Sequence, residues 1–196
     1  QCGMDWDVPA AYPRAKCVVL LVKAYSPYKR ADDIRPYTRT DSGPDYILSY
    51  YIAEHEAYFE AKALAKEIAA GGFYCEPARI PARALALENG VGAYSKNGLL
   101  AIGGFGTRAA LFTLATNACE PQPDAGGHPA CPDGCDACAR ACPTGAICGA
   151  VLDATKCLRY FMDGAAHPRF VLEKLTALLG CDLCQRACPK NAHLNA

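Results

Sequence analysis

The chain has 196 residues, of which 52% are hydrophobic and 20% are charged, with 20 basic and 20 acidic side chains. This composition is typical of a globular protein with one sizeable domain, or with a medium and a small domain. The balanced charge argues against nucleic acid as the main partner, and the longest apolar run, residues 17–22, is too short to cross a bilayer. We therefore expect a cytoplasmic protein with no membrane or DNA partner.

The chain opens with a predicted strand, a long loop and a long helix. The continuous apolar run at residues 17–22 predicts a buried strand, and the polar stretch 26–44, with its three prolines, predicts a loop. Apolar residues then recur at helical spacing over residues 45–70, and Gly71-Gly72 provides a stop signal.

The apolar positions of that helix predict which side faces the core. They recur at steps of three to five residues, at Leu48, Ile52, Phe59, Leu64 and Ile68. His55 falls between two of these positions, so we expect it on the apolar side, either as a hydrogen-bonded core residue or in contact with a cofactor.

Shorter elements follow. Residues 73–75 predict a strand, and residues 82–88 predict a helix that Pro81 opens. Residues 90–108 contain six glycines, which fit either a hairpin flanked by turns or a backbone that approaches a flat ligand closely. Another strand is expected at 111–116. This alternation indicates an α/β domain, followed by a small cysteine-rich module from about residue 119.

Thirteen cysteines are the outstanding feature, and ten of them lie in the last 78 residues. Residues 131–143 read C-x3-C-x2-C-x3-C-P, and residues 181–189 read C-x2-C-x3-C-P, with Cys157 between the two segments. Bacterial ferredoxins use C-x2-C-x2-C-x3-C-P, and the fourth cysteine of each run binds the other cluster. Proline after that cysteine fixes φ and redirects the chain.

The spacing therefore predicts two [4Fe–4S] clusters with crossed ligands. The expected ligand sets are Cys131, Cys135, Cys138 and Cys188 for one cluster, and Cys142, Cys157, Cys181 and Cys184 for the other. Cys131 is the least regular ligand, because one extra residue separates it from Cys135.

Other uses of the cysteines were weighed. Zinc prefers paired C-x2-C knuckles, which Cys135/Cys138 and Cys181/Cys184 would supply, but zinc leaves both Cys-Pro steps unexplained. A disulfide scaffold has no support from a leader sequence. Five cysteines remain, and we expect no special role for any of them: Cys2, Cys17, Cys75, Cys119 and Cys148. Cys17 and Cys75 lie in predicted strands, where a free cysteine acts as a small buried hydrophobe.

Five segments in order resemble the epoxyqueuosine reductases, which are cobalamin-dependent enzymes of tRNA modification related to the reductive dehalogenases. These segments are VVLLVKAYSPY, ARALALENGVGAYSKNGLL, GCDACARACPTGAI, LDATKCLRYF and GCDLCQRACPKN, and the likeness spans residues 12–192. The cysteine runs alone are shared with many ferredoxins, whereas the glycine-rich segment and LDATKC make the resemblance specific.

The resemblance implies an α/β (α+β) fold in two domains. Residues 1–118 would form a nitroreductase-like, corrinoid-binding domain, and residues 119–196 a ferredoxin-like domain with two [4Fe–4S] clusters. The glycine-rich element lies near the corrinoid in that family, so the resemblance implies corrinoid-binding residues at Tyr94, Lys96, Asn97 and Gly98.

The resemblance also bears on catalysis and partners. The family's Asp-Tyr-His, whose aspartate donates the proton, is matched only partly by Asp45 and the two residues after it, so Tyr50 and Tyr51 are further candidates. The sequence ends eight residues after Cys188, so we do not expect the helical repeats with which the family grips tRNA, or tRNA itself as a partner.

We therefore predict an iron–sulfur oxidoreductase that passes electrons through two [4Fe–4S] clusters to a bound cobalamin and receives them from a redox partner protein. Two alternatives remain open. One is a non-catalytic electron carrier that reactivates a corrinoid protein, and the other is epoxyqueuosine reductase itself.

Overall fold

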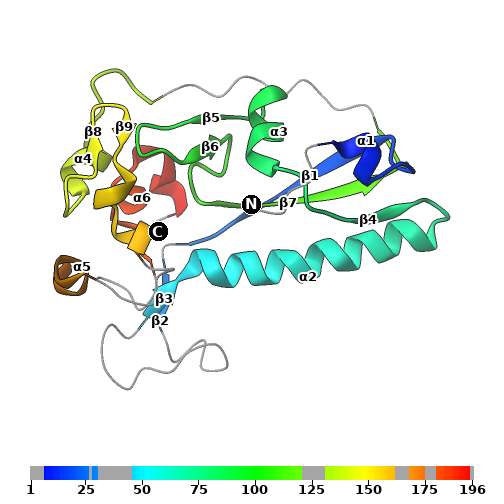
Figure 1. Ribbon diagram of the computed structural model, residues 1–196, viewed down its shortest axis with the longest axis horizontal. Coiled ribbons are helices and arrows are strands. Elements are labelled where there is room, and N and C mark those ends of the chain that lie inside the picture. The colour runs from blue at the N-terminus through cyan, green and yellow to red at the C-terminus, as the bar shows by residue number, and fades with distance from the viewer. Residues whose placement is uncertain are drawn as a thin grey trace.

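The computed structural model describes residues 7–26, 28–30, 46–120, 131–161, 168–174 and 180–194 (Figure 1). Its centre is a three-stranded antiparallel sheet in the order β1-β7-β4. The strands are β1 (Cys17–Ala24), β7 (Ala109–Thr116) and β4 (Cys75–Ala78). The middle strand is mostly buried because it has a partner strand along both edges and packed elements on both faces.

The sheet is covered on both faces. The long helix α2 (Ser49–Ala70) packs against one face. The other face carries α1 (Val8–Ala11), α3 (Ala82–Glu88) and the hairpin of β5 (Gly92–Tyr94) and β6 (Leu100–Ile102). The predicted strands at 17–22 and 111–116, the helix at 82–88 and the hairpin are confirmed.

Helix α2 uses alanines to contact the sheet. Its buried residues recur every four positions, at Ala53, Ala57, Ala61 and Ala65. Small side chains on this stripe let the helix lie close to the strands, and larger residues are displaced to its flanks. The predicted core side was therefore partly wrong: Phe59 is 54% exposed, and His55 is exposed with its ring 4.9 Å from that of Phe59.

Other boundaries differ from the prediction. A two-stranded ribbon pairs β2 (Tyr28–Arg30), inside the predicted loop, with β3 (Tyr46–Leu48), at the start of the predicted helix. Helix α2 therefore begins at Ser49 rather than at residue 45. Strand β4 starts at Cys75, later than expected. Helix α1 was missed, although Asp7 caps it by accepting a hydrogen bond from the Ala10 N–H at 3.2 Å.

Short elements form the cysteine-rich part, which lies beyond one end of the sheet (Figure 1). They are α4 (Ala137–Ala141), β8 (Ile147–Cys148), β9 (Val151–Leu152), η2 (Ala154–Lys156), η3 (Leu158–Phe161), α5 (Arg169–Lys174), α6 (Leu183–Arg186) and η4 (Pro189–Leu194). None of the described helices has the length and apolar character needed to span a membrane.

A disulfide joins Cys17 to Cys119, which corrects the expectation that both have no special role. The register of β1 with β7 places Cys17 opposite Thr116, three residues before Cys119, and the Cα atoms of the two cysteines lie 5.9 Å apart. Cys75 is free and packs under α2, as expected, and Cys148 is exposed. Cys2 lies outside the described residues.

The two parts of the molecule meet through a buried ion pair. The Arg108 guanidinium, just before β7, lies 3.2 Å from Asp182 Oδ2, and both side chains are almost fully buried. Arg186 binds the other carboxylate oxygen at 2.8 Å. A carboxylate between two guanidiniums is well compensated, so this buried charge is tolerated.

Side-chain amides extend the junction. Gln185 donates to the Thr107 carbonyl at 2.7 Å and to the Tyr25 hydroxyl at 3.0 Å. Asn191 donates to the Thr107 hydroxyl at 2.8 Å, and its Oδ1 accepts from the Thr107 N–H at 2.8 Å. These bonds fix the carboxyl-terminal segment against the turn that precedes β7.

Gly106 marks the closest approach at this junction. Its φ is +55°, and a Cβ built there would lie 2.6 Å from the Lys190 carbonyl oxygen and against Asn191 Oδ1. We predict that Gly106→Ala lowers the free energy of unfolding by about 3 kcal/mol or more, since backbone strain and overpacking add. Thermal and urea unfolding of the anaerobically prepared protein measure the loss.

Gly104→Ala is the matched control. Gly104 has a φ of +72°, but no heavy atom lies within 4 Å of its hypothetical Cβ. It should lose only about 1–2 kcal/mol from strain. Equal losses in the two variants would contradict the close packing at Gly106.

Candidate functional site

Two ten-residue segments build the cysteine-rich site. Residues 134–143 read GCDACARACP and residues 180–189 read GCDLCQRACP, so they agree at eight of ten positions. In each segment a cysteine precedes a short helix, a second lies inside it and a third follows it, on α4 in one case and α6 in the other. The same local sequence therefore produces the same presentation of thiols twice.

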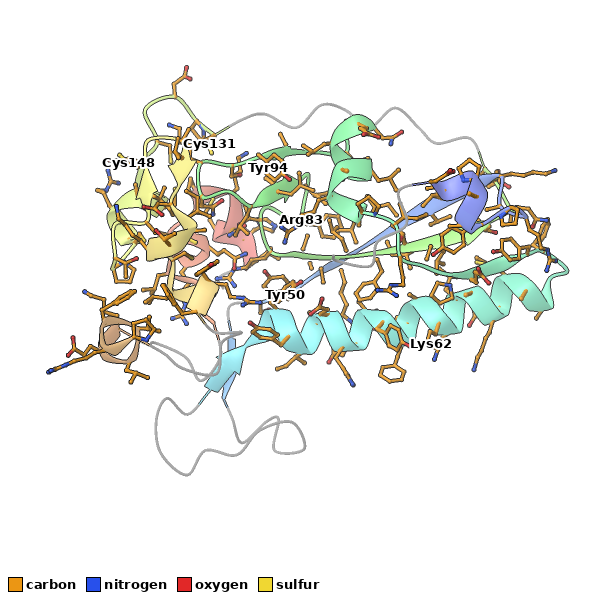
Figure 2. All side chains as sticks on the ribbon, in the orientation of Figure 1. Tyr50, Lys62, Arg83, Tyr94, Cys131 and Cys148 are labelled. Carbon is orange, nitrogen blue, oxygen red and sulfur yellow. A yellow bond between two sulfur atoms is a disulfide. The ribbon has the colours of Figure 1, made fainter. Side chains whose placement is uncertain are left out.

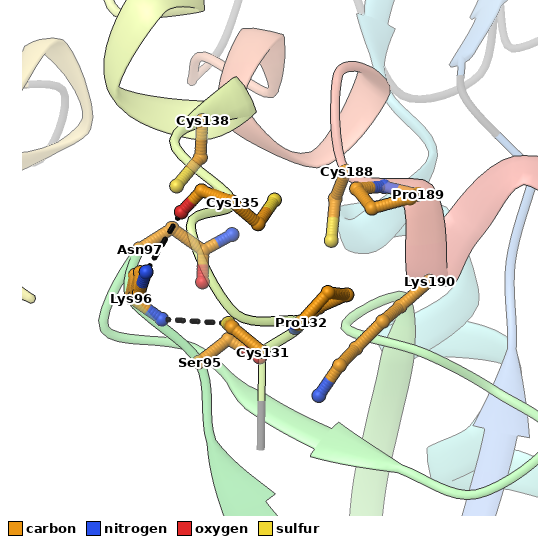
Figure 3. A pocket seen from close by; sticks show the side chains of 10 residues that line it. All are labelled: Ser95, Lys96, Asn97, Cys131, Pro132, Cys135, Cys138, Cys188, Pro189 and Lys190. Atoms are coloured by element: carbon orange, nitrogen blue, oxygen red, sulfur yellow. Dashed lines mark hydrogen bonds between the residues drawn. The ribbon is translucent and has the colours of Figure 1, made fainter. Parts of the chain in front are cut away.

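One small cavity collects the first set of cysteines. Figure 3 shows it with Ser95, Lys96 and Asn97 from the hairpin beside the thiols. Its cysteines are Cys131, Cys135, Cys138 and Cys188. Cys135 and Cys138 come from the first segment, Cys131 lies three residues before it, and Cys188 comes from the second segment, which is the grouping expected from the crossed pattern. We call these four the first cysteine set.

The other four cysteines line a different and larger cavity. They are Cys142, Cys157, Cys181 and Cys184, which we call the second cysteine set. Cys142 comes from the first segment and two others from the second, so the exchange is reciprocal. Cys157 follows η2, which Asp153 caps by accepting from the Thr155 N–H at 3.0 Å.

Crowding of these thiols makes their charged forms costly without a metal. Burial, and then the neighbouring thiolates, raise the pKa of Cys184 to about 12. Burial also raises the pKa of three others, Cys138, Cys181 and Cys188. Thiolates that are packed together out of water need cationic partners, and the irons of a cluster supply them.

The pKa of Cys142 shifts in the opposite direction, because its hydrogen bonds outweigh burial. Burial acts to raise its pKa, but hydrogen bonds from Thr144 and from the backbone outweigh burial and lower it. The Thr144 hydroxyl lies 3.5 Å from Cys142 Sγ, and the Ala146 N–H donates to the same sulfur at 3.3 Å. These hydrogen bonds favour the thiolate form of Cys142, which is the form that binds metal.

The arrangement disfavours a single metal ion. Within the described ranges, no three His, Cys, Asp or Glu side chains are placed to hold one ion. The paired knuckles that zinc would need are separated, because Cys135 and Cys138 line one cavity while Cys181 and Cys184 line the other. In a cubane each ligand binds a different iron, so its sulfurs lie farther apart than zinc ligands do.

The β5–β6 turn reaches into the first set. The Lys96 N–H donates to Cys131 Sγ at 3.3 Å, and its ammonium donates to the Cys135 carbonyl at 2.8 Å. Gly98 packs against Leu152 of β9. Lys96, expected near a corrinoid, therefore lies against the first cysteine set.

Asn97 and Tyr94 have different surroundings from Lys96. Asn97 lines both cavities, so it lies between the first set and the larger space. Tyr94 lines the larger cavity and is 53% exposed.

The larger cavity has a volume of about 840 Å³ and lies between the sheet, the hairpin and the cysteine-rich part. Figure 2 shows Tyr50, Arg83 and Tyr94, which line it from α2, α3 and β5. Its described lining is mainly apolar, and Arg83 and Arg159 are the charged residues in it. This size and character suit a bulky organic cofactor.

Three tyrosines besides Tyr94 line the same space. Tyr50 donates to Glu54 at 3.2 Å, and burial, followed by the Glu54 charge, raises the pKa of Tyr50 to about 12. Tyr51 has its ring 5.6 Å from that of Tyr50. The third, Tyr25, accepts the bond from Gln185, and burial raises its pKa. The candidate acid Asp45 lies outside the described residues.

Sequence reasoning missed several residues of the cavities. Tyr25, Arg83 and Arg159 all fall inside the segments that carry the family resemblance, so their place there was the available signal. Ser95 lies within the glycine-rich segment, between two residues that were singled out.

Comparison with known proteins bears on both parts. Residues 130–191 match the model of a family described as "4Fe-4S double cluster binding domain". The cysteine-rich part therefore binds two [4Fe–4S] clusters. A comparison of the sequence with curated proteins finds no match.

Solved structures resemble nearly the whole chain. An epoxyqueuosine reductase from Bacillus subtilis aligns with a TM-score of 0.69 and 23% identity over 99% of this chain, and one from Streptococcus thermophilus with 0.66 and 23% over 97%. The chain has the fold of the epoxyqueuosine reductases. It spans about half of their length, 55% in both cases, and the α+β expectation is confirmed.

A third structure carries information on a ligand. It is described as an epoxyqueuosine reductase with an epoxyqueuosine-modified tRNA-Tyr stem loop, and it aligns with a TM-score of 0.67 and 21% identity. This chain covers 56% of it.

The repeated segments give a matched pair of variants. Asp182 and Asp136 occupy equivalent positions, but Asp182 is buried beside Arg108, whereas Asp136 forms an exposed pair with Arg140. We predict that Asp182→Ala lowers the free energy of unfolding by about 3–5 kcal/mol, because it removes the carboxylate that pairs with the buried Arg108 charge. Asp136→Ala should cost less than about 1 kcal/mol. Denaturant unfolding measures both, and similar losses would contradict the assigned role of Asp182.

Proposed function

We propose that the protein is an iron–sulfur oxidoreductase of the epoxyqueuosine reductase type, which delivers electrons through its two clusters to a corrinoid in the larger cavity. We assign one cluster to the first cysteine set and the other to the second, in a domain from residue 119 onward. The observation that carries the proposal is that the second cysteine set opens onto an 840 Å³ cavity.

The placement of the two sets suggests an order of electron transfer. The second cysteine set lines the large cavity. The first cysteine set lines the separate small cavity beside the hairpin. Electrons from a redox partner protein would thus enter at the first set and leave through the second. When bound, the clusters supply one-electron transfer, and the corrinoid supplies a reactive cobalt.

The chain itself provides the walls and the polar groups of the cavity. Tyr94 and Asn97 line it from the hairpin, and α3 lines it with Arg83. Apolar walls of β6 and β7 exclude water from a flat ligand. Of the four residues that we expected to bind the corrinoid, Tyr94 remains the better candidate, since Lys96 contacts the first cysteine set and Asn97 also lines the cavity of that set.

Tyr50 is our candidate proton donor. Its side chain lines the cavity, and a pKa of about 12 keeps the phenol protonated at neutral pH. Tyr51 is a second candidate, and Asp45 stays a prediction.

Epoxyqueuosine in a tRNA stem loop is the substrate to test first. We did not expect tRNA as a partner, yet one structure of this fold contains such a stem loop. Two arginines at the cavity, Arg83 and Arg159, would suit a polyanion. The chain spans only about half of those reductases, so this substrate is part of the proposal.

A non-catalytic electron carrier is less well supported. A carrier needs clusters near its surface but has no use for a large cavity next to one of them. The cavity beside the second cysteine set therefore favours an enzyme.

The first test is metal and corrinoid binding. Protein purified without oxygen should contain about eight irons per chain, and added cobalamin should shift its visible spectrum on binding. We predict that Ala84→Trp, which fills the cavity from α3, weakens cobalamin binding tenfold or more. Ala63→Trp, on the exposed side of α2, should leave binding within about twofold.

Three outcomes would contradict the proposal. Purified protein that contains no iron would contradict the proposed clusters. Absence of cobalamin binding at high micromolar concentration would contradict the proposed corrinoid. Equal binding by the two tryptophan variants would place the corrinoid outside this cavity.

A separate prediction concerns proton transfer. Tyr50→Phe should lower reduction of the epoxyqueuosine stem loop by about 10²-fold or more, which is typical of a lost general acid. Cobalamin affinity should stay within about threefold, because the ring remains. Unchanged turnover in single-turnover assays would exclude Tyr50 as the donor.

A further inference from the structure

Two buried polar groups of the β5–β6 turn have no hydrogen-bond partner among the described residues. They are the Ser95 hydroxyl and the Asn97 side-chain amide nitrogen. Ser95 is 6% exposed and Asn97 is 3% exposed, so water does not readily satisfy them. Buried donors without partners are rare in folded proteins because each costs desolvation free energy, so a missing acceptor is expected nearby.

The orientation of Asn97 follows from its other contact. Its Oδ1 accepts a hydrogen bond from the Leu99 N–H at 3.1 Å. The opposite end of the side chain is therefore the NH2 group, which can only donate.

The Ser95 hydroxyl is likewise not needed to hold the turn together. Its backbone N–H donates to the Leu99 carbonyl at 2.8 Å, and its carbonyl accepts from the Gly98 N–H at 2.9 Å. These two bonds close the turn without the hydroxyl.

Both groups line the cavity of the first cysteine set (Figure 3). Lys96, between them, already donates its backbone N–H to Cys131 Sγ at 3.3 Å. Three consecutive residues thus present donors to the place where four cysteine sulfurs gather, and sulfur is the acceptor that this place would supply.

We propose that Ser95 and Asn97 donate hydrogen bonds to sulfur atoms of the cluster held by the first cysteine set, and thereby raise its reduction potential. Together with Lys96 they form a three-donor cradle, which belongs to the amino-terminal part of the chain. The inference rests on the proposed assignment of this cluster and adds residues that set its potential.

The expected direction follows from charge. Reduction adds an electron to the cluster and increases the negative charge on its sulfurs, so donors to sulfur stabilise the reduced form more than the oxidised form. Removing a donor lowers the potential. Burial strengthens the effect because the local dielectric constant is low.

The test is a redox titration of the anaerobically prepared, iron-loaded protein, followed by electron paramagnetic resonance. Ser95→Ala should decrease the reduced-to-oxidised ratio of one cluster at fixed potential by about tenfold, which corresponds to 59 mV for a one-electron couple. Ser95→Thr, which keeps the hydroxyl, should restore most of the potential. Asn97→Asp keeps the acceptor for Leu99, removes the donor and should also lower the potential.

Thr144→Val provides the reciprocal control. The Thr144 hydroxyl lies 3.5 Å from Cys142 Sγ, in the second cysteine set. This variant should lower the potential of the other cluster and leave the one affected by Ser95→Ala unchanged. Each variant therefore contains an internal reference.

The outcomes separate this inference from the proposed function. Wild-type protein without iron would refute the clusters themselves. A full complement of eight irons with potentials unmoved in both Ser95→Ala and Asn97→Asp would overturn the cradle alone. A purely structural role of the turn predicts lower thermal stability with unchanged potentials, which would also overturn it.

Discussion

A buried carboxylate between two guanidiniums holds the cysteine-rich part against the sheet. Asp182 lies inside the second cysteine segment, directly between two predicted ligands, and it pairs with Arg108 at the start of β7. The position of the second cysteine set relative to the cavity therefore depends on this contact. Gln185 and Asn191 reinforce this contact with hydrogen bonds to Thr107. Three side chains of the carboxyl-terminal segment therefore bind the turn before β7.

The sequence predicted the cysteine grouping because spacing on a short helix determines where each sulfur points. The first cysteine set lines one cavity and the second set lines another, and the ligand assignment stays a prediction. The two repeats look nearly identical in sequence, yet Asp136 is exposed and Asp182 is buried. That difference arises from long-range packing, which the local sequence pattern does not encode. The two segments differ only in Leu183 for Ala137 and Gln185 for Ala139.

Other features were hidden from the sequence for related reasons. Helix α2 packs through alanines, whose weak hydrophobicity gives little periodic signal, so Phe59 seemed to mark the core. The Cys17–Cys119 bridge depends on the register of β1 with β7. The cavity joins residues from α2, α3, the hairpin and the cysteine-rich part, and no single segment could reveal it.

The exchange of Cys142 and Cys188 between the two segments has a consequence for biosynthesis. On the proposed assignment, the first site gains its last sulfur only when the carboxyl-terminal segment has folded back onto α4. Both sites therefore need the carboxyl-terminal segment, so neither can be completed while only the earlier part of the chain has been synthesised. Iron–sulfur loading must follow the synthesis of both segments.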